Sequence, residues 1–346
     1  MRGLRKYLTP FAPDQSGAVS VLFELGGIVV ICDAGGCTGN VCGFDEPRWF
    51  EQKSAIFSAG LRDMDAILGR DDRLVAKLAD VVQKIDATFV AVIGTPVPAV
   101  IATDYLALKR MSEKKIKLPI LTVDTDGMEL YDKGEEKAFL ELFKIFAIEK
   151  YQAEEDRIGI LGMTPQDVSD LDAADKIRDL YQQKYGKQAV CYCMGDGLEE
   201  IREASSVSRN IVVSPAALMT AKYLEKTFGT PYEIHYPLVD ELIPDVDYTG
   251  KEVLIVHQQV IANSIRKELL KGAKRVQIAS WFMMKKELLA DGDVLLRDED
   301  AYIELVQNGD FDIIFADGCM ERMIPEFKGI FVDTRHFAVS GKLIGK

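Results

Sequence analysis

The chain has 346 residues, of which 48% are hydrophobic, and a formal net charge of −13. This length suffices for two or three domains, and the acidic balance argues against nucleic-acid binding, which needs clustered Lys and Arg. No apolar run reaches the roughly 20 residues that span a bilayer, and the N-terminal segment MRGLRKYLTPFAPDQSG lacks the apolar stretch of a signal peptide. We therefore expect a cytoplasmic protein that binds neither a membrane nor nucleic acid.

The chain alternates short β-branched apolar runs with amphipathic helical stretches, a pattern typical of parallel-sheet α/β folds. The first unit has predicted strands at 27–32, 88–94 and 118–124, and predicted helices at 71–85, 98–115 and 137–151. The second has predicted strands at 157–163, 189–195 and 210–215, and predicted helices at 172–186 and 216–229. The third has predicted strands at 252–258, 276–281, 312–318 and 329–336, and a predicted helix at 260–273.

Two polar stretches separate these units. Charged residues gather at 149–157, and Pro and Asp gather at 237–250. We therefore predict three small parallel-sheet, Rossmann-like domains at 1–152, 153–240 and 241–346. Ligands of such folds bind beyond the carboxyl ends of the strands, so clefts between the domains are the expected binding places.

The cysteines point to metal chemistry. Six cysteines in a chain expected to be cytoplasmic are not expected to form disulfides. Three of them, Cys32, Cys37 and Cys42, fall within the glycine-rich segment IVVICDAGGCTGNVCGF. Thiolates are the ligands that iron–sulfur clusters require, and Gly35 and Gly36 would let the backbone approach a bulky cofactor. The segment therefore predicts an iron–sulfur site. The alternative is a cysteine-containing strand followed by a flexible loop.

The spacing of this cysteine run leaves its ligand set incomplete. C-x4-C-x4-C differs from the C-x2-C pairs of zinc knuckles, and it supplies three thiolates where a closed cluster site takes four. Asp14, an open position or a second subunit could complete the set. No G-x4-G-K-[ST] motif is present in the sequence, so we do not expect this chain to hydrolyse nucleotides.

Other candidate groups lie at or just past predicted strand ends. Cys193, Cys319 and His336 are candidate catalytic groups in a cavity between the domains. Each can also be explained as a buried structural residue, because free cysteines are commonly buried. Strand alternation would place Cys191 and Cys193 on one face with Tyr192 opposite, and we expect Cys191 in the core.

The segment VDTDG at 123–127 offers two further carboxylates. Asp124 and Asp126 could pair as acid and base. A D-x-D-G sequence after a strand more commonly forms an Asx-type turn, and we expect that turn here.

The order of motifs resembles component 1 of nitrogenase and its relatives, among them the light-independent protochlorophyllide and chlorophyllide reductases and nickel-sirohydrochlorin diamide reductase. The family opens with a strand followed by H-G-P-x-G-C, a place that VVICDAGGC occupies here. Later stretches resemble further family elements, at 60–78, 89–105, 122–134, 224–232 and 312–333. The resemblance spans nearly the whole chain.

The resemblance implies an iron–sulfur cluster, [4Fe-4S] or larger, at a subunit interface near a two-fold axis. It also implies a separate ATP-dependent iron–sulfur reductase as the electron donor. Cys37 matches the one family cysteine that is plainly retained, whereas the family's upstream cysteine has no equivalent beyond Asp14 and its third lies near Thr95. Two thiolates from each of two identical subunits would complete a four-iron cluster, and three from each would permit a larger one.

These expectations lead to one main hypothesis, in which the chain is the catalytic component of a nitrogenase-like two-component reductase that acts as a homodimer on a small molecule. Ser214-Pro215 stands where the family anchors its large cofactor through a cysteine, so the resemblance implies a substrate other than dinitrogen. The alternatives are a non-catalytic scaffold or carrier for metallocluster assembly, and a plain binding protein with incidental cysteines.

Overall fold

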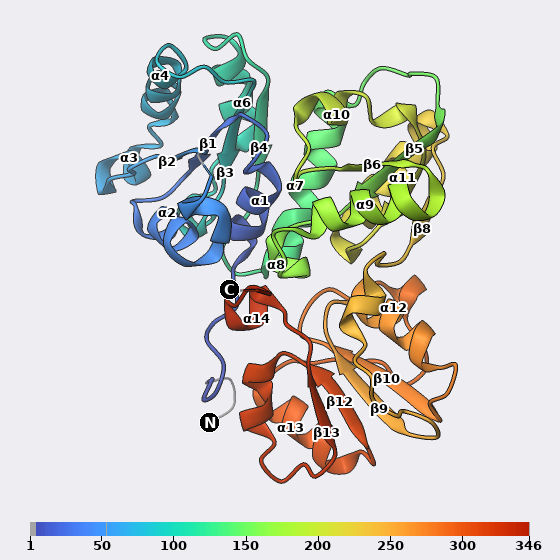
Figure 1. Ribbon diagram of the computed structural model, residues 1–346. Coiled ribbons are helices and arrows are strands. Elements are labelled where there is room, and N and C mark those ends of the chain that lie inside the picture. Colours follow the sequence, from blue (N-terminus) through green and yellow to red (C-terminus); the bar gives the residue numbers. More distant parts are fainter. Residues whose placement is uncertain (1–4, 53, 346) are drawn as a thin grey trace.

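The computed structural model describes residues 5–52 and 54–345, which form three β-sheets with helices on their faces (Figure 1). Every strand pairing within these three sheets is parallel. The predicted α/β class is therefore confirmed. Short, continuously apolar runs become strands because helices cover both faces of a parallel sheet, so that its side chains are buried on either side.

The first sheet has the order β2-β1-β3-β4. Its strands are β1 (Ile28–Ile31), β2 (Ala55–Ser58), β3 (Val90–Ile93) and β4 (Ile120–Val123). On one face pack α1 (Asp14–Leu22) and α7 (Tyr131–Phe146), and on the other α4 (Asp71–Val82) and α6 (Tyr105–Glu113). Short helices follow its strands, namely α2 (Gly36–Asn40), the π-helix η1 (Val41–Asp45), the 3₁₀ helix η2 (Pro47–Phe50), α3 (Asp63–Leu68) and α5 (Pro96–Val100).

The second and third sheets repeat this pattern with the orders β6-β5-β7-β8 and β11-β10-β9-β12-β13. The second contains β5 (Glu154–Leu161), β6 (Gln188–Cys191), β7 (Val207–Val212) and β8 (Tyr232–Ile234), with α8 (Pro165–Val168), α9 (Ala173–Tyr185), α10 (Leu198–Arg202), η3 (Ala204–Ser206), η4 (Pro215–Ala217) and α11 (Leu218–Phe228). The third contains β9 (Glu252–Val256), β10 (Arg275–Ser280), β11 (Val294–Leu295), β12 (Ile313–Ala316) and β13 (Ile330–Asp333). Its helices are η5 (Val239–Leu242), α12 (Gln259–Leu269), η6 (Lys286–Leu288), α13 (Glu299–Asn308), η7 (Gly318–Met323) and α14 (Phe337–Ser340).

Helix α7 joins the first two sheets, between which it lies in Figure 1. Its residue Phe143 packs edge-on against Tyr192 at a ring-centroid distance of 5.3 Å, within one continuous core. Two glycines let α1 and α7 cross in backbone contact: a Cβ at Gly17 would lie 1.9 Å from the Tyr131 carbonyl oxygen, and one at Gly134 would lie 1.7 Å from that of Asp14. The N-terminus of α7 is thereby fixed against α1.

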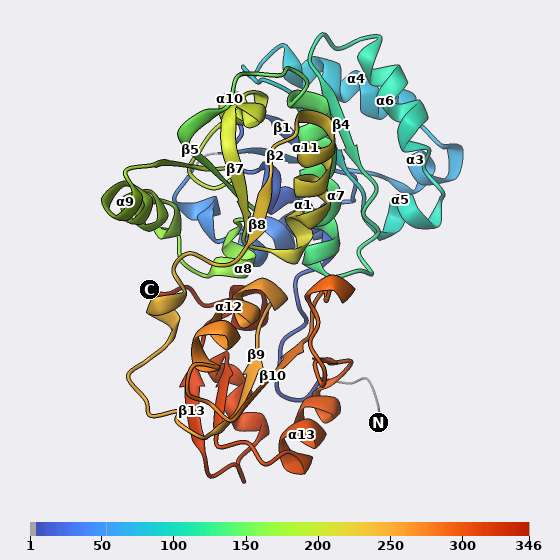
Figure 2. The same ribbon diagram turned by 90° about the vertical axis from the view of Figure 1, so that its right-hand side faces the viewer.

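Both ends of the chain fasten the third sheet to the rest. The N-terminal segment runs from α1 toward α13 (Figures 1 and 2), where the Glu299 carboxylate accepts hydrogen bonds from the backbone N–H groups at 6–8. At the other end α14 lies against α8, and the backbone N–H of Phe337 donates to Ser169 Oγ at 2.6 Å. Because both ends cross the boundaries proposed from the sequence, the division into 1–152, 153–240 and 241–346 stays a prediction.

Two details of the predicted elements are wrong. The predicted helix 98–115 is two helices, α5 and α6, because Ala102 adopts a left-handed φ of 54° and Asp104 caps α6 by accepting from the backbone N–H groups of 106 and 107. The predicted alternation of Cys191 and Cys193 fails because β6 ends at Cys191 and Cys193 has a φ of 66°. Cys193 therefore packs in the same core as Tyr192, whereas Cys191 packs in the core that contains Ile158 and Ile160.

Two smaller expectations are confirmed. Cys191 is buried in a hydrophobic core. Asp126 forms the expected Asx-type turn, since its Oδ1 accepts from the backbone N–H of Met128 at 2.8 Å and of Glu129 at 3.3 Å. Among the helices of the described segments, none combines the length and apolarity needed to cross a membrane.

Candidate functional site

The cysteine-rich turn follows β1 at the carboxyl edge of the first sheet. Gly35 has a φ of 120°, which disfavours any residue with a side chain, and it starts α2, which continues directly into the π-helix η1. Asp33 fixes this turn: its carboxylate accepts from the backbone N–H of Thr38 at 2.7 Å, from Thr38 Oγ1 at 2.9 Å and from Ser58 Oγ of β2 at 2.6 Å. The start of α2 is therefore tied to the sheet.

The three thiols of this turn do not face the same way. Cys37 and Cys42 are partly exposed and pack against the core that contains Val29 and Ile31. Cys32 is 2% exposed and packs with Val30 on the opposite face of the sheet. The prediction that Cys32 joins Cys37 and Cys42 as a third ligand is therefore not supported by this geometry, because strand alternation turns its side chain to the other core.

No group of three or more His, Cys, Asp or Glu within residues 5–52 and 54–345 is arranged to hold a metal ion. Asp14, the alternative fourth ligand, is also engaged elsewhere. Its carboxylate is buried and accepts from the backbone N–H of Asp126 at 2.9 Å and of Gly127 at 2.7 Å. Cys37 and Cys42 are thus the two thiols of this turn that pack on the same face of the sheet.

The surface around these two thiols is open. Gly35 and Gly36 are exposed, and a Cβ placed on either of them, or on Gly39 or Gly43, would meet no atom within 4 Å. Beside the turn lies a groove of about 330 Å³, lined by Gly43, Phe44, Glu46, Pro47, Phe50, Phe337, Gly341, Lys342 and Leu343. Phe44 and Phe50 are 76% and 79% exposed, which is unusual for large apolar side chains that gather at one place. Partly exposed thiols, open glycines and exposed aromatic rings therefore follow one another within residues 35–50.

The electrostatics of the turn keep both thiols protonated when no metal is bound. Burial, and then the Asp33 carboxylate, raise the pKa of Cys37 above that of an ordinary cysteine. Burial, and then Glu46 and Asp33, do the same for Cys42. Since the thiolate is the reactive form, these cysteines are poor nucleophiles near neutral pH. A bound metal ion would deprotonate them outright.

We therefore expect alkylation of Cys37 and Cys42 in the metal-free protein to be slow at neutral pH. A raised pKa means that the thiolate fraction, and with it the rate with iodoacetamide, still increases above about pH 9. Mass spectrometry of peptides after timed alkylation measures this profile, with a short unstructured cysteine peptide as the reference. If the alkylation rate of the protein levelled off at a lower pH than that of the peptide, this result would contradict the assigned electrostatics.

The candidate catalytic cysteines lie apart from each other. Cys193 is fully buried in the core shared by the first two sheets, whereas Cys319 in η7 packs, half-buried, against the core of the third. Burial is the first cause that raises the pKa of each thiol. The structure does not gather these two cysteines in one cavity, and their catalytic role stays a prediction.

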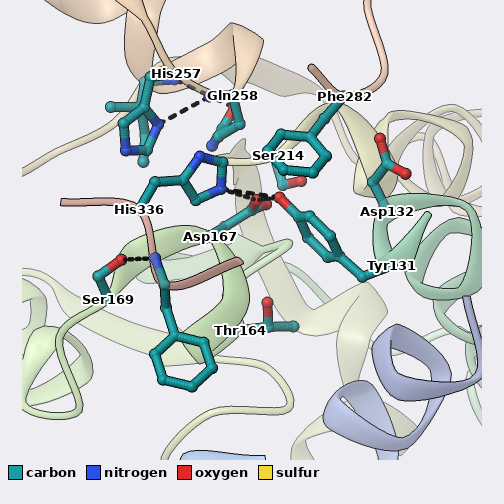
Figure 3. Close-up of polar contacts among 12 residues, drawn as sticks. Tyr131, Asp132, Thr164, Asp167, Ser169, Ser214, His257, Gln258, Phe282 and His336 are labelled. Carbon is teal, nitrogen blue, oxygen red and sulfur yellow. Dashed lines mark hydrogen bonds and ion pairs between the residues drawn. The ribbon is translucent and has the colours of Figure 1, made fainter. Parts of the chain in front are cut away.

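His336 follows β13, is buried, and lies beside Tyr131, Asp167 and His257 (Figure 3). Its Nε2 lies 3.0 Å from the hydroxyl of Tyr131 at the start of α7, and that hydroxyl donates to Asp167 Oδ1 in α8 at 2.5 Å. The His257 ring, which follows β9, stacks on His336 at 4.3 Å. One side chain from each of the first two sheets' sets of elements and two from the third thus meet here, at a place that we call the junction (Tyr131, Asp167, His257 and His336).

Two important residues were not found from the sequence. Asp167 follows a predicted strand, in the segment where α/β ligands gather, and this position could have singled it out. Arg48 had no such signal. It is 1% exposed and its guanidinium donates to Glu46, to Glu24 and to the Ser20 carbonyl oxygen at 2.7–2.8 Å. It thereby fixes the segment that follows Cys42.

Positions that stand in place of family cysteines have structural roles here. Ser214 is buried, and its Oγ accepts from the backbone N–H of Ala216 at the start of η4. Thr95 is also buried, and its hydroxyl donates to the Cys32 carbonyl oxygen at 2.7 Å. Neither position presents a soft ligand for a metal.

Comparisons with known proteins agree on one family. A family model described as nitrogenase component 1 type oxidoreductase matches residues 14–240. A curated relative from Clostridium pasteurianum, described as nitrogenase iron-molybdenum cofactor biosynthesis protein NifE, is 29% identical over 287 residues, which are 80% of this chain and 56% of the relative. A protein of the same description from Bradyrhizobium diazoefficiens is 22% identical over 185 residues, which are 51% of this chain and 32% of the relative. The chain thus spans about half the length of the first of these relatives and about a third of the second.

Solved structures agree at the level of the fold. A structure described as nitrogenase Cp1 at pH 6.5 aligns with a TM-score of 0.72 and 12% identity, over 96% of this chain and 87% of that chain. A second, described as nitrogenase Cp1 at pH 5, aligns with a TM-score of 0.69 and 14% identity, over 96% and 84% of the two chains. At this identity the likeness shows the fold alone.

Proposed function

The chain belongs to the nitrogenase component 1 type oxidoreductases, and on that premise we propose that it holds an iron–sulfur cluster between two copies of itself. Cys37 and Cys42 of each copy would be the ligands. The single observation that carries this proposal is that these two thiols, and not Cys32, lie partly exposed on one face. A [4Fe-4S] cluster takes four thiolates, so two from each subunit complete the set.

The surface of the turn supports an interface at this place. The exposed rings of Phe44 and Phe50 and the open glycines would be covered by the second copy, and burying such aromatic groups favours association. Loss of water around the thiols also suits a low-potential cluster, because solvent exposure and hydrogen bonds to sulfur tune its potential.

We further propose that the chain is the catalytic component of a two-component reductase. An ATP-dependent iron–sulfur reductase would supply electrons, and the cluster would store and pass them on to a small-molecule substrate other than dinitrogen. The residues of this chain would perform the remaining tasks: Asp33 orients the turn, Arg48 fixes the segment after Cys42, and the groove lined by Phe44 and Phe337 offers a place for substrate.

A second candidate function is a non-catalytic scaffold or carrier for metallocluster assembly. The observation that favours it is that both curated relatives are described as proteins of iron-molybdenum cofactor biosynthesis. The same two thiols would then hold a cluster for transfer rather than for turnover.

Two measurements test these functions in order. Anaerobically purified protein should contain about four iron and four sulfide ions per dimer, with the paramagnetic resonance of a reduced cluster. Protein that is monomeric and free of iron after reconstitution would contradict both functions. Consumption of ATP coupled to substrate reduction, with the cognate reductase added, then separates the enzyme from the scaffold.

A further inference from the structure

Asp167 of the junction and Glu135 of α7, which both bond to Thr164, are buried acids whose oxygens are not all hydrogen-bonded within the described part of the chain. Asp167 and Glu135 are at most 1% exposed. Asp167 Oδ1 accepts from Tyr131, and Glu135 Oε1 accepts from Thr164 Oγ1 at 2.6 Å. Among the described residues, Asp167 Oδ2 and Glu135 Oε2 have no hydrogen-bond partner although both atoms are buried. A buried carboxylate oxygen without a donor is costly, so this arrangement requires an explanation.

Among the described residues, no lysine or arginine forms an ion pair with Asp167 or Glu135, and the basic group beside them is His336, whose Nε2 lies 3.7 Å from Asp167 Oδ1 and is charged only when protonated. Arg48 acts on Glu135 only at a distance, because its guanidinium is committed to Glu46, Glu24 and Ser20. On α7 itself Asp132 adds a third carboxyl, which accepts from the backbone N–H of Met283. Two ionised carboxylates at such a place would pay both the cost of burial and their mutual repulsion.

A proton removes this cost. Glu135 accepts one hydrogen bond, from Thr164 Oγ1, and its Oε2 is buried without a partner among the described residues, so we place the proton at rest on Glu135. Burial, and then Asp167, raise the pKa of Glu135 well above its ordinary value. Burial likewise raises the pKa of Asp132 to about 6. The geometry and the direction of these shifts agree.

The hydroxyl of Tyr131 also connects the pair to the third sheet. It lies within hydrogen-bonding distance of both Asp167 Oδ1 and His336 Nε2 (Figure 3). His257, stacked on His336, does not extend this path: its Nδ1 accepts from the backbone N–H of Gln258 at 2.8 Å, and its Nε2 lies 3.1 Å from the Arg335 carbonyl oxygen. Burial, and then His336, lower the pKa of His257, so this ring is neutral.

We propose that Glu135 and Asp167 together hold one proton at neutral pH and that Tyr131 relays a proton between this pair and His336. The relay step starts from the form of the pair in which the shared proton is on Asp167 and Glu135 is the carboxylate. The Asp167 O–H bond breaks as its proton passes to the Tyr131 oxygen, while the Tyr131 proton passes to His336 Nε2. Asp167 ends as the carboxylate, Tyr131 is restored, and His336 becomes the imidazolium. The reverse step returns the proton.

This relay gives the proposed reductase a proton donor, and that use rests on the proposed function. Adding two electrons to an unsaturated bond also adds two protons, and the cysteine turn supplies none because its thiols become metal ligands. His336 adjoins Phe337, which lines the groove beside the turn. The proton-holding pair itself does not depend on the cluster.

Infrared spectroscopy of the full-length, metal-free chain tests the pair. A buried protonated carboxyl has a C=O stretch separate from the amide and carboxylate bands. We expect one such band at pH 7.5 in the wild type, and its loss in Glu135→Gln. Absence of the band from the wild type, or its survival in Glu135→Gln, would overturn the assignment.

Exchange of this band in D2O tests the relay. Tyr131→Phe should keep the band but slow its exchange at least about tenfold, which corresponds to about 1.4 kcal/mol in the exchange barrier. Tyr302→Phe is the matched control, since Tyr302 is equally buried and its hydroxyl has no partner among the described residues; its exchange should equal that of the wild type. Equal exchange in both variants would refute the relay.

A readout on the wild type keeps the relay testable if Tyr131→Phe does not fold. The chain contains only three histidines, so the His336 ring resonance can be followed during a pH titration, with the half-buried His235 as an internal reference. The carboxyl band should shift at the same pH midpoint as the His336 ring resonance. A band whose position does not change at that midpoint would refute the relay. Because no iron is used, failure of these tests and failure of the cluster proposal are distinguishable.

Discussion

Replacing Arg48 by methionine is expected to destabilise the protein by about 3–5 kcal/mol. Arg48 is 1% exposed. Its Nε and Nη2 each donate to the Glu46 carboxylate at 2.7 Å, which makes a bidentate contact, and its Nη1 donates to Glu24 Oε1 at 2.8 Å. Burial alone lowers the pKa of Arg48, but these carboxylates more than offset it and raise the pKa. Methionine fills the space but leaves the buried Glu46 carboxylate without its cation, although the backbone N–H of residue 48 still donates to it, and removing one partner of a buried ion pair is costly.

Equilibrium unfolding in guanidinium chloride measures this effect. Arg70→Met is the matched control, because Arg70 makes an exposed ion pair with Asp72 and such pairs contribute about 0–1 kcal/mol. Arg48→Lys should fall between the two, since lysine keeps the charge but cannot form the bidentate contact. Equal unfolding midpoints for Arg48→Met and Arg70→Met would show that the buried pair does not stabilise the fold.

The loss should extend beyond the turn. Arg48 Nη1 also lies 3.4 Å from the Cys193 carbonyl oxygen, and Glu24 accepts from the backbone N–H of Gly195 at 2.7 Å. The Cys193 carbonyl and the Gly195 N–H both lie in the segment that follows β6, a strand of the second sheet. The arginine therefore links the cysteine turn to a neighbouring sheet, and its removal should increase the protease sensitivity of the turn as well as lower the stability.

The strands could be predicted because parallel sheets leave a local signal. Runs such as 27–32 and 88–94 are short and continuously apolar, and they become β1 and β3 with every side chain buried. Edge strand β2 was missed, since Ala55–Ser58 is only partly buried and contains two small residues. The break between α5 and α6 was missed because the left-handed turn at Ala102 has no glycine or asparagine to indicate it.

The candidate site was only half predictable for a related reason. Clustering of Cys37 and Cys42 is local, so the sequence could bring them together on one turn. The junction is not local: Tyr131 and Asp167 are 36 positions apart, and Tyr131 and His336 are 205 positions apart. No spacing rule joins such residues, because their contact depends on how the three sheets pack. Arg48 likewise has an ordinary sequence context, and only its burial distinguishes it.

Cysteine substitutions are expected to have the largest functional effect. In Cys37→Ser and in Cys42→Ser, each dimer would keep two of the four thiolates that a [4Fe-4S] cluster takes. Iron content should therefore fall from about four per dimer to less than about one tenth of that value. Iron and sulfide assays on anaerobically reconstituted protein, with the visible absorption of the cluster, measure the loss. A fully loaded Cys37→Ser variant would refute the assignment of Cys37.

Cys32→Ala decides between two thiolates and three thiolates per subunit. Cys32 packs on the opposite face of the sheet from the other two cysteines, and burial raises its pKa to about 12, so it should stay a thiol and the variant should load iron as the wild type does. Cys191→Ala is the matched control, because it also removes a buried thiol from a core and raises no question of ligation. Loss of iron from Cys32→Ala alone, with both variants folded, would mean that β1 ends differently in the loaded protein and that each subunit gives three thiolates to a larger cluster. Retention of iron in both variants would leave Cys37 and Cys42 as the pair that two subunits must share.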